Sequence, residues 1–336
     1  MNSNASFTRR AALVVAIAAA AWSPLPPARA ADATDAPEQL RVGFQKGSIN
    51  LVLLKQRATL EQRLPRTKVS WVEFPAGPQL LEALAVGGID IGATGDTPPV
   101  FAQAAGKALL YVGAEPPKPD ASAILVKPDS PIRTLADLKG RKVALQKGSS
   151  AHFLLVRALE KAQLPWSDIQ TVYLPPADAR AAFEKGAIDA WVIWDPYYAA
   201  AEIAGNTRVL ATSRGLTNNN SVYLAAPAFA RQHGETLRQV FTALTEADAW
   251  AQANRSEAAQ RVAEFTGLSL ATVHRVLARR PASPVGPVTP QIVADQQRVA
   301  DAFTALQLIP ARINVADAVW AGAATRVAQQ AQASNR

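Results

Sequence analysis

The sequence predicts an α/β protein made of two similar lobes, each with a central, mostly parallel sheet flanked by helices, and a ligand cleft between them. Short β-like segments alternate with helical segments from Leu40 onward, which is typical of parallel sheets. A strand–turn–helix motif of the first half returns in the second half, which indicates that the two lobes are alike. The chain has 336 residues, too many for one small core, so two domains of ordinary size are expected.

The first 30 residues have the features of a secretory signal peptide. Arg9 and Arg10 form a positive start, ten apolar residues (13–22) follow, and an Ala-x-Ala cleavage signal ends at Ala30. An apolar run of this length is too short to span a bilayer. We therefore expect an exported, periplasmic protein cleaved near Ala30. The arginine pair leaves twin-arginine export open beside the general secretory route.

Charge and cysteine content narrow the kind of partner. The chain has no cysteine, so we expect no lipid anchor and a soluble, monomeric mature protein that is stabilised by packing rather than disulfides. The net charge is +8, and +5 (8 − 3) once Arg9, Arg10 and Arg29 are removed. Basic residues are scattered among acidic ones without a basic run, so no nucleic-acid partner is expected. A positive surface instead favours the arrival of small anions.

The first half contains the elements of one lobe and a proline-rich segment after them. Prolines 116, 117 and 119 interrupt any regular element between residues 115 and 120, which indicates a crossing between lobes. A second crossing is expected at residues 218–221. We predict lobe 1 at residues 31–117 and 222–336, and lobe 2 at 118–221. The elements expected before the first crossing are strands at 41–44, 69–74, 89–93 and 109–112, and helices at 51–64 and 79–86.

The region after the second crossing is predicted to be mainly helical and to pack back over the first lobe. It begins with a return strand at 221–225. We find no catalytic motif in this tail. The helices expected here are 234–254, 257–266, 270–279, 290–306 and 315–329.

The internal repeat is the most informative pattern in the chain. Residues 41–48 (RVGFQKGS) return as residues 142–149 (KVALQKGS), an offset of 101 (142 − 41). Residues 84–90 (LAVGGID) return as residues 183–189 (FEKGAID), an offset of 99 (183 − 84). The nearly constant register predicts two equivalent lobes, with the ligand at the carboxyl ends of their strands.

The repeated Gly-Ser turns suggest an anion site. The first turn of a helix has unpaired N–H groups and a partial positive charge, so it can bind an oxyanion without a cationic side chain. Gly47 and Ser48 open one predicted helix, and Ser149 and Ser150 open the equivalent helix in the other lobe. The competing interpretation is ordinary serine capping of each helix.

The strand ends carry a second group of candidates. Asp195 precedes Pro196, which predicts a helix N-cap, and Thr97 before Pro98 is interpreted in the same way. Thr94 has no such structural role and is the better ligand donor. Trp191 and Trp194 lie three apart on one strand and face opposite sides, and we place Trp194 in the cleft.

Enzymatic interpretations are poorly supported. The three histidines, His152, His233 and His274, are too dispersed to suggest a metal cluster, and nucleophile-elbow, dinucleotide and phosphate-loop motifs do not occur. We therefore expect no enzyme, no catalytic residue, no metal and no cofactor. His152 lies close to the second Gly-Ser turn, where it either contacts the anion or simply covers its neighbours.

Several motifs resemble the aliphatic sulfonate-binding proteins of ABC transporters. They are residues 74–81 (FPAGPQLL), 146–152 (QKGSSAH), 173–180 (YLPPADAR) and 194–197 (WDPY). The resemblance covers essentially the whole mature chain. It implies a type II periplasmic-binding fold, an alkanesulfonate ligand, delivery to an ABC permease and a role in sulfur acquisition. The residues proposed to bind the ligand are Gln45, Gly47, Ser48, Phe74, Gly77, Thr94, Gly95, Thr97, Ser149, Ser150, His152, Trp194 and Asp195.

Two alternatives remain open from the sequence. A receptor of the same fold for taurine, nitrate or another small anion would use Asp96 or Asp195 to hold any ligand amine. An enzyme related to thiamin-pyrimidine synthase would require a histidine-rich site and no export signal, and both expectations conflict with the sequence.

Overall fold

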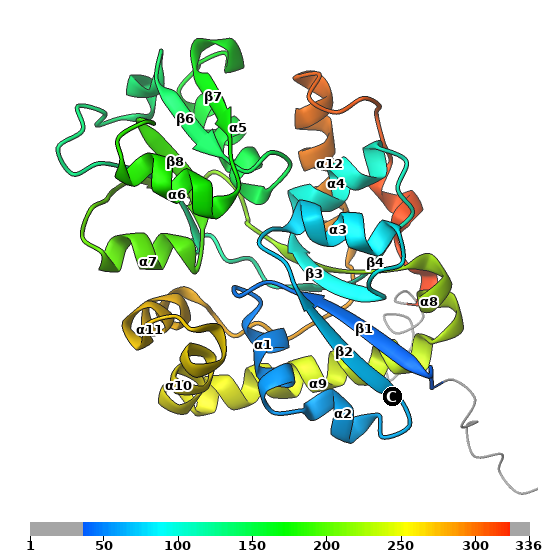
Figure 1. Ribbon diagram of the computed structural model, residues 1–336. Coiled ribbons are helices and arrows are strands. Elements are labelled where there is room, and N and C mark those ends of the chain that lie inside the picture. Colours follow the sequence, from blue (N-terminus) through cyan, green and yellow to red (C-terminus); the bar gives the residue numbers. More distant parts are fainter. Residues whose placement is uncertain (1–35, 323–336) are drawn as a thin grey trace, which may run out of the picture. The chain divides into compact units, whose positions relative to one another are not determined.

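A computed structural model describes residues 36–322 of the chain (Figure 1). The predicted signal peptide and the end of the last predicted helix (323–329) lie outside the described residues. Within residues 36–322, no helix is both long enough and apolar enough to cross a membrane.

Two five-stranded sheets organise the described chain. The first has the order β2-β1-β3-β10-β4 and the second the order β7-β6-β8-β5-β9. In the first sheet β10 runs antiparallel to β3 and β4, and in the second sheet β5 runs antiparallel to β8 and β9. The other neighbouring strands, β2-β1-β3 and β7-β6-β8, are parallel. The strands are β1 (Gln39–Phe44), β2 (Lys68–Glu73), β3 (Ile91–Gly95), β4 (Leu110–Glu115), β5 (Ser122–Val126), β6 (Lys142–Leu145), β7 (Gln170–Tyr173), β8 (Ala190–Trp194), β9 (Arg208–Thr212) and β10 (Ser221–Ala225).

The shared topology confirms the predicted fold class of two similar α/β lobes. The repeated Ile-Asp pair has the same function in both, since Asp90 accepts the backbone N–H of Arg41 and Asp189 that of Lys142, each at 2.8 Å. These bonds tie the start of one parallel strand to the loop that leads into the next. The exact lobe boundaries remain a prediction.

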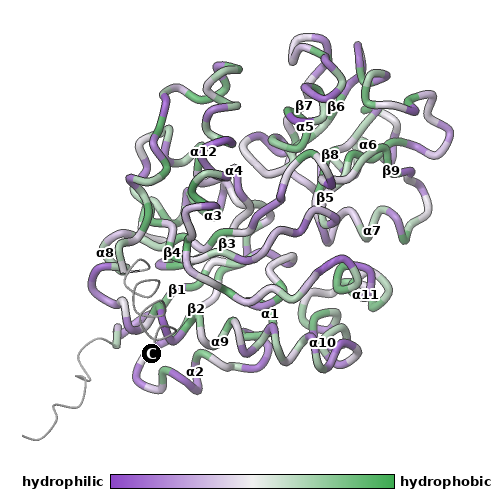
Figure 2. Tube along the Cα trace, turned by 180° about the vertical axis from the view of Figure 1, so that it is seen from behind, coloured by the Kyte–Doolittle hydropathy of each residue, from purple (hydrophilic) through white to green (hydrophobic). Residues whose placement is uncertain are grey.

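The helices of the second sheet are α5 to α7, and the remaining helices surround the first sheet. Figure 2 shows hydrophobic and hydrophilic residues mixed along these helices, as expected when one face of each is buried. Their bounds are α1 (Ile49–Gln56), α2 (Thr59–Arg63), α3 (Gly77–Ala85), α4 (Thr97–Ala104), α5 (Ser150–Lys161), α6 (Pro176–Glu184), α7 (Tyr197–Ile203), α8 (Pro227–Gln232), α9 (Gly234–Ala253), α10 (Arg255–Thr266), α11 (Leu270–Arg279) and α12 (Pro290–Ala305), with 3-10 turns η1 (Leu135–Leu138), η2 (Trp166–Asp168) and η3 (Val315–Ala318).

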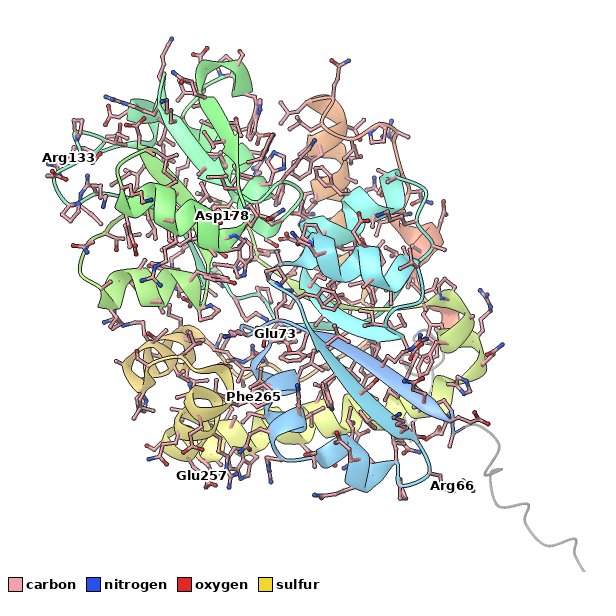
Figure 3. The ribbon with its side chains drawn as sticks, in the orientation of Figure 1. Arg66, Glu73, Arg133, Asp178, Glu257 and Phe265 are labelled. Atoms are coloured by element: carbon pink, nitrogen blue, oxygen red, sulfur yellow. The ribbon has the colours of Figure 1, made fainter. Side chains whose placement is uncertain are left out.

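The core of the first lobe includes the helical tail, as predicted. Buried residues of α9, α10 and α11 share one apolar cluster with β1 and α1. Phe44 packs against Trp71 and Phe265 with ring centroids 6.2 and 6.1 Å away, and Phe265 is labelled in Figure 3. On the other face, α3, α4 and α12 form a second cluster.

Two predicted helices differ from the structure. The helix expected at 51–64 is broken at Ala58, whose φ of 50° is left-handed, and α2 then turns Leu60 into the core. The helix expected from Val315 is wrong over its first residues, because they form the short turn η3. Val319 then forms a bridge with Tyr111, which extended backbone permits and a helix does not.

The two crossings lie side by side. Residues 116–121 join β4 to β5, and residues 213–220 join β9 to β10. The N–H of Lys118 donates to the carbonyl of Asn218 at 3.1 Å, and the Asn219 amide donates to the carbonyl of Lys118 at 2.8 Å. The two predicted crossings are therefore joined to each other by hydrogen bonds, although neither forms a regular strand.

Candidate functional site

A cavity of about 110 Å³ lies at the carboxyl ends of the strands and is lined by both lobes and both crossings. Its position is the one expected for a ligand of an open α/β sheet. Ten of the predicted site residues line it: Gln45, Gly47, Ser48, Gly77, Thr94, Gly95, Ser149, Ser150, Trp194 and Asp195. The other lining residues are Ile49, Ala93, Pro98, Glu115, Lys118, Ala121, Asn219, Ser221, Val276 and Arg280.

The two Gly-Ser turns have equivalent geometry. The N–H of Ser48 donates to the carbonyl of Gln45 at 2.8 Å, and the N–H of Ser149 to that of Gln146 at 3.2 Å. Neither serine side chain caps its helix. The structure therefore does not support capping as the role of these serines. In the first turns the N–H of Ile49 donates to the carbonyl of Gly47 and that of His152 to the carbonyl of Ser149, and the other first-turn N–H groups of α1 and α5 are the ones we consider for a ligand.

The lobes touch closely at the cavity, and glycine permits this contact. A Cβ on Gly47 would lie 2.6 Å from the carbonyl oxygen of Asp195, and one on Gly95 would overlap the hydroxyl of Ser150. Each pair joins a strand end of the first lobe to a helix start of the second. Side chains at these glycines would hold the lobes apart.

Ser150 brings an unused donor to the cavity. Its hydroxyl is buried near the carboxyl of Asp96, but it makes no hydrogen bond of normal geometry to Asp96 or to any other residue within residues 36–322. The side chain stands at the first residue of α5, where the helix dipole favours negative charge. A hydrogen-bond acceptor on a ligand would satisfy this hydroxyl.

Three charged residues of the cavity were not predicted from the sequence. Glu115, Lys118 and Arg280 are all more than 90% buried, with exposures of 6%, 8% and 7%. They come from the end of β4, the first crossing and the residue after α11, so no local pattern connects them. Burial would raise the pKa of Glu115, but Arg280 and Lys118 together lower it to about 2. The carboxylate therefore stays ionised at neutral pH.

Asp195 joins the cavity to a contact between the lobes. Its Oδ1 accepts the N–H of Ala199 at 3.0 Å and a bond from Arg279 Nη1 at 3.2 Å. It therefore holds the first turn of α7, close to its predicted capping role, although Pro196 occupies the N-cap position itself. Burial raises the pKa of Asp195 to about 7 against the opposing effect of Arg279.

Phe74 and Thr97 do not line the cavity. Phe74 belongs to a separate surface depression beside Tyr197. Thr97 is fully buried at the first residue of α4 and donates its hydroxyl to Asp96 Oδ1 at 2.9 Å. The predicted N-cap at Thr97 is wrong by one residue, since Asp96 occupies that position without a side-chain capping bond.

His152 is also outside the cavity. Its side chain is fully buried among aromatic rings, with the centroids of Phe303 and Trp166 at 4.8 and 5.1 Å. Its Nδ1 accepts the N–H of Gly148 at 3.3 Å. Burial, helped by Lys147, lowers the pKa of His152 to about 3. Of the two interpretations, the structure supports a residue that covers its neighbours.

Acidic and histidine side chains do not gather into a metal site in the part of the chain that the structure describes. The cavity instead combines helix N-termini, hydroxyl groups, one tryptophan and two cations. Two α/β lobes of equal topology that enclose such a cavity at a double crossing define the class of two-lobed solute-binding proteins.

Comparison with known proteins narrows this class. A model of the NMT1-like family matches residues 33–267. A candidate aliphatic sulfonates-binding protein of Escherichia coli (strain K12) is 51% identical over 288 residues, which are 86% of this chain and 90% of the relative. The chain therefore belongs to the NMT1-like family, in the group of the aliphatic sulfonate-binding proteins.

Two solved structures agree with this placement, and both are 51% identical to the chain. The alkanesulfonate-binding protein SsuA from Xanthomonas axonopodis pv. citri, bound to MOPS, superposes with a TM-score of 0.82, and the match covers 84% of this chain and 98% of the SsuA chain. The periplasmic aliphatic sulphonate binding protein SsuA from Escherichia coli has a TM-score of 0.79 and covers 84% and 92%. The resemblance found in the sequence is confirmed.

Proposed function

We propose that the protein is a periplasmic solute-binding protein that captures aliphatic sulfonates in the cavity between its lobes and delivers them to an ABC importer for sulfur acquisition. The observation that carries the proposal is a pair of buried donors that make no hydrogen bond of normal geometry within residues 36–322, the hydroxyl of Ser150 and Nη2 of Arg280. Both belong to residues that line the cavity. The family relationship supports the same ligand class.

The donors match the chemistry of a sulfonate. A sulfonate has three acceptor oxygens, one negative charge and no proton in the working pH range. Buried donors without partners are unfavourable, so an acceptor that satisfies them gains affinity. The helix starts of α1 and α5 add N–H groups and a favourable dipole. Trp194, Pro98 and Val276 offer apolar surface to the carbon chain.

The proposal includes the export and partner assignments made from the sequence. We place the mature chain in the periplasm as a monomer after cleavage near Ala30, with lobe 1 at 31–117 and 222–336 and lobe 2 at 118–221. The ten predicted site residues that line the cavity are proposed as ligand contacts. The cavity has no arrangement that we assign to catalysis, so binding without turnover is proposed.

Calorimetry tests this proposal directly. The purified protein is titrated with ethanesulfonate, 2-hydroxyethanesulfonate, taurine, nitrate and sulfate. We expect binding of a sulfonate at one molecule per chain and recovery of the ligand unchanged. Binding of nitrate or sulfate with no heat from any sulfonate would refute the ligand class.

A further inference from the structure

One wall of the cavity is charged, and we call it the charged wall: Glu115, Lys118 and Arg280. All three line the cavity and are more than 90% buried. The wall stands at the crossings, because Glu115 ends β4 and Lys118 lies in the segment that leads to β5. Ser150, in contrast, starts α5 in the other lobe. The cavity therefore has two donor groups on different elements.

Both carboxylate oxygens of Glu115 already accept hydrogen bonds from the protein. Its Oε2 accepts from Lys118 Nζ at 2.5 Å and from Arg280 Nη1 at 3.4 Å. Its Oε1 accepts from the hydroxyl of Tyr223 at 2.9 Å and from the amide of Asn50 at 3.4 Å. Glu115 therefore holds the two cations in place and offers no free acceptor to a ligand.

Both cations have N–H groups that are not hydrogen-bonded to the protein. Arg280 Nη2 forms an ion pair with Asp248 Oδ1 at 3.8 Å, which is too long for a hydrogen bond, and it makes no hydrogen bond among the described residues. The ammonium of Lys118 has three N–H groups, one of which is bound to Glu115. A plain alkyl chain against this wall would leave the donor of Arg280 unsatisfied. An oxygen atom would satisfy it.

Charge balance indicates which oxygen fits. Glu115 and Asp248 offset Lys118 and Arg280, so the four side chains together carry no net charge. A neutral oxygen can accept from such a group without adding a second buried charge beside the sulfonate. An ammonium would instead meet two cations, which is unfavourable.

We propose that the charged wall is a second binding subsite, which selects short sulfonates that carry a hydroxyl or carbonyl oxygen on the carbon chain. The inference rests on the proposed function, in which the helix starts and Ser150 hold the sulfonate group. Arg280 donates to the ligand oxygen and Lys118 supports it. A site built to hydrogen-bond a ligand group discriminates strongly against an analogue that lacks the group.

The test compares 2-hydroxyethanesulfonate with ethanesulfonate by calorimetry on the full protein. We expect the hydroxylated ligand to bind about 10-fold to 100-fold more tightly, the range for one hydrogen bond to a charged group. Taurine, with an ammonium at the same position, should bind more weakly than either. Arg280→Met should bring the ratio of the two sulfonate affinities close to one.

Arg275→Met is the matched control, because Arg275 lies on α11, does not line the cavity, has a side chain that is 47% exposed and forms an ion pair with Glu202 at 3.8 Å. It should keep the wild-type ratio. Equal affinities of both sulfonates for the wild-type protein would overturn the subsite and leave the proposed function intact. Binding of neither sulfonate would instead refute the proposed function. If Arg280→Met does not fold, Arg280→Lys replaces it in the comparison with the wild type. An unchanged ratio of the two sulfonate affinities in Arg280→Lys would show that the guanidinium group does not donate to the ligand oxygen.

Discussion

At the scale of single residues, the two adjacent serines at the start of α5 have different partners. The hydroxyl of Ser149 donates to the carbonyl of Gln146 at 2.7 Å, whereas that of Ser150 makes no hydrogen bond of normal geometry within residues 36–322. The structure therefore assigns a local structural bond to Ser149 and leaves Ser150 available to the ligand. The sequence alone does not distinguish the two serines, because both belong to the same Gly-Ser turn.

Substitution of these serines separates binding from stability. Ser150→Ala should weaken sulfonate binding by about 1.5–3 kcal/mol, the range for a hydrogen bond to a charged group, with little change in the melting temperature. Ser149→Ala should lower the free energy of unfolding by about 1 kcal/mol with a smaller effect on affinity. Calorimetry and urea unfolding measure the two effects. An unchanged affinity in Ser150→Ala would remove this hydroxyl from the site.

His152 gives a prediction for the pH dependence of stability. Its pKa is about 3 in the folded protein and about 6.5 when unfolded, so the unfolded state binds the extra proton first. The stabilisation is present above pH 6.5 and is lost as the pH falls toward 3. Between pH 7.5 and pH 5 the loss is about 2 kcal/mol.

His152→Phe, measured by urea unfolding at pH 7.5 and pH 5.0, should remove most of this difference. The substitution also removes the acceptor of the Gly148 N–H, so the variant is expected to be less stable than the wild type at pH 7.5. Sulfonate affinity should show no titration from this residue. An identical acid-induced loss in both proteins would contradict the buried neutral imidazole.

At the scale of helices and strands, a buried contact between the lobes joins α11 to α7. Arg279 pairs with Asp195 at 3.2 Å and with Glu202, and its guanidinium lies 3.7 Å from the ring centroid of Tyr198. The side chain of Arg279 is 12% exposed. We call these four residues the clasp. The clasp can form only while the lobes are together, and Asp195 connects it to the cavity.

Loss of the clasp should speed the release of ligand. Because Arg279→Ala removes contacts of the closed form only, we expect the dissociation rate to rise about tenfold or more, corresponding to at least about 1.4 kcal/mol. Stopped-flow displacement of bound 2-hydroxyethanesulfonate, followed by tryptophan fluorescence, measures the rate. Arg275→Ala is the control, because it removes only a half-exposed ion pair to Glu202 at 3.8 Å and should therefore change the rate much less. Equal rates in wild type and Arg279→Ala would show that the clasp does not stabilise closure.

Periodicity predicted most regular elements but not the interruptions. The strand at 221–225 and the helix at 270–279 agree with β10 and α11 at both ends, because turn residues and apolar alternation mark them. The helix break at Ala58 could not be predicted, because no proline or glycine marks it in the sequence. The left-handed backbone of Ala58 instead accompanies the burial of Leu60 in the core. The charged wall was missed for a related reason. It assembles from segments about 165 residues apart, Glu115 and Arg280 (280 − 115).

At the scale of the whole described chain, the internal repeat explains why the sequence was informative. Two copies of one strand–turn–helix unit place equivalent helix starts, α1 and α5, on opposite sides of one cavity. Each lobe alone offers one of these two helix starts. The close approach of Gly47 to Asp195 and of Gly95 to Ser150 shows that the cavity is complete only when both lobes meet.

Closure of the lobes around a sulfonate is the central claim, and small-angle scattering tests it most directly. The radius of gyration is measured for the protein alone and with 2-hydroxyethanesulfonate at a concentration that calorimetry shows to be saturating. A ligand held by both lobes favours the closed form by the difference of its affinities for the two forms. We predict a smaller radius of gyration with the ligand. An unchanged radius at saturation would contradict capture between moving lobes.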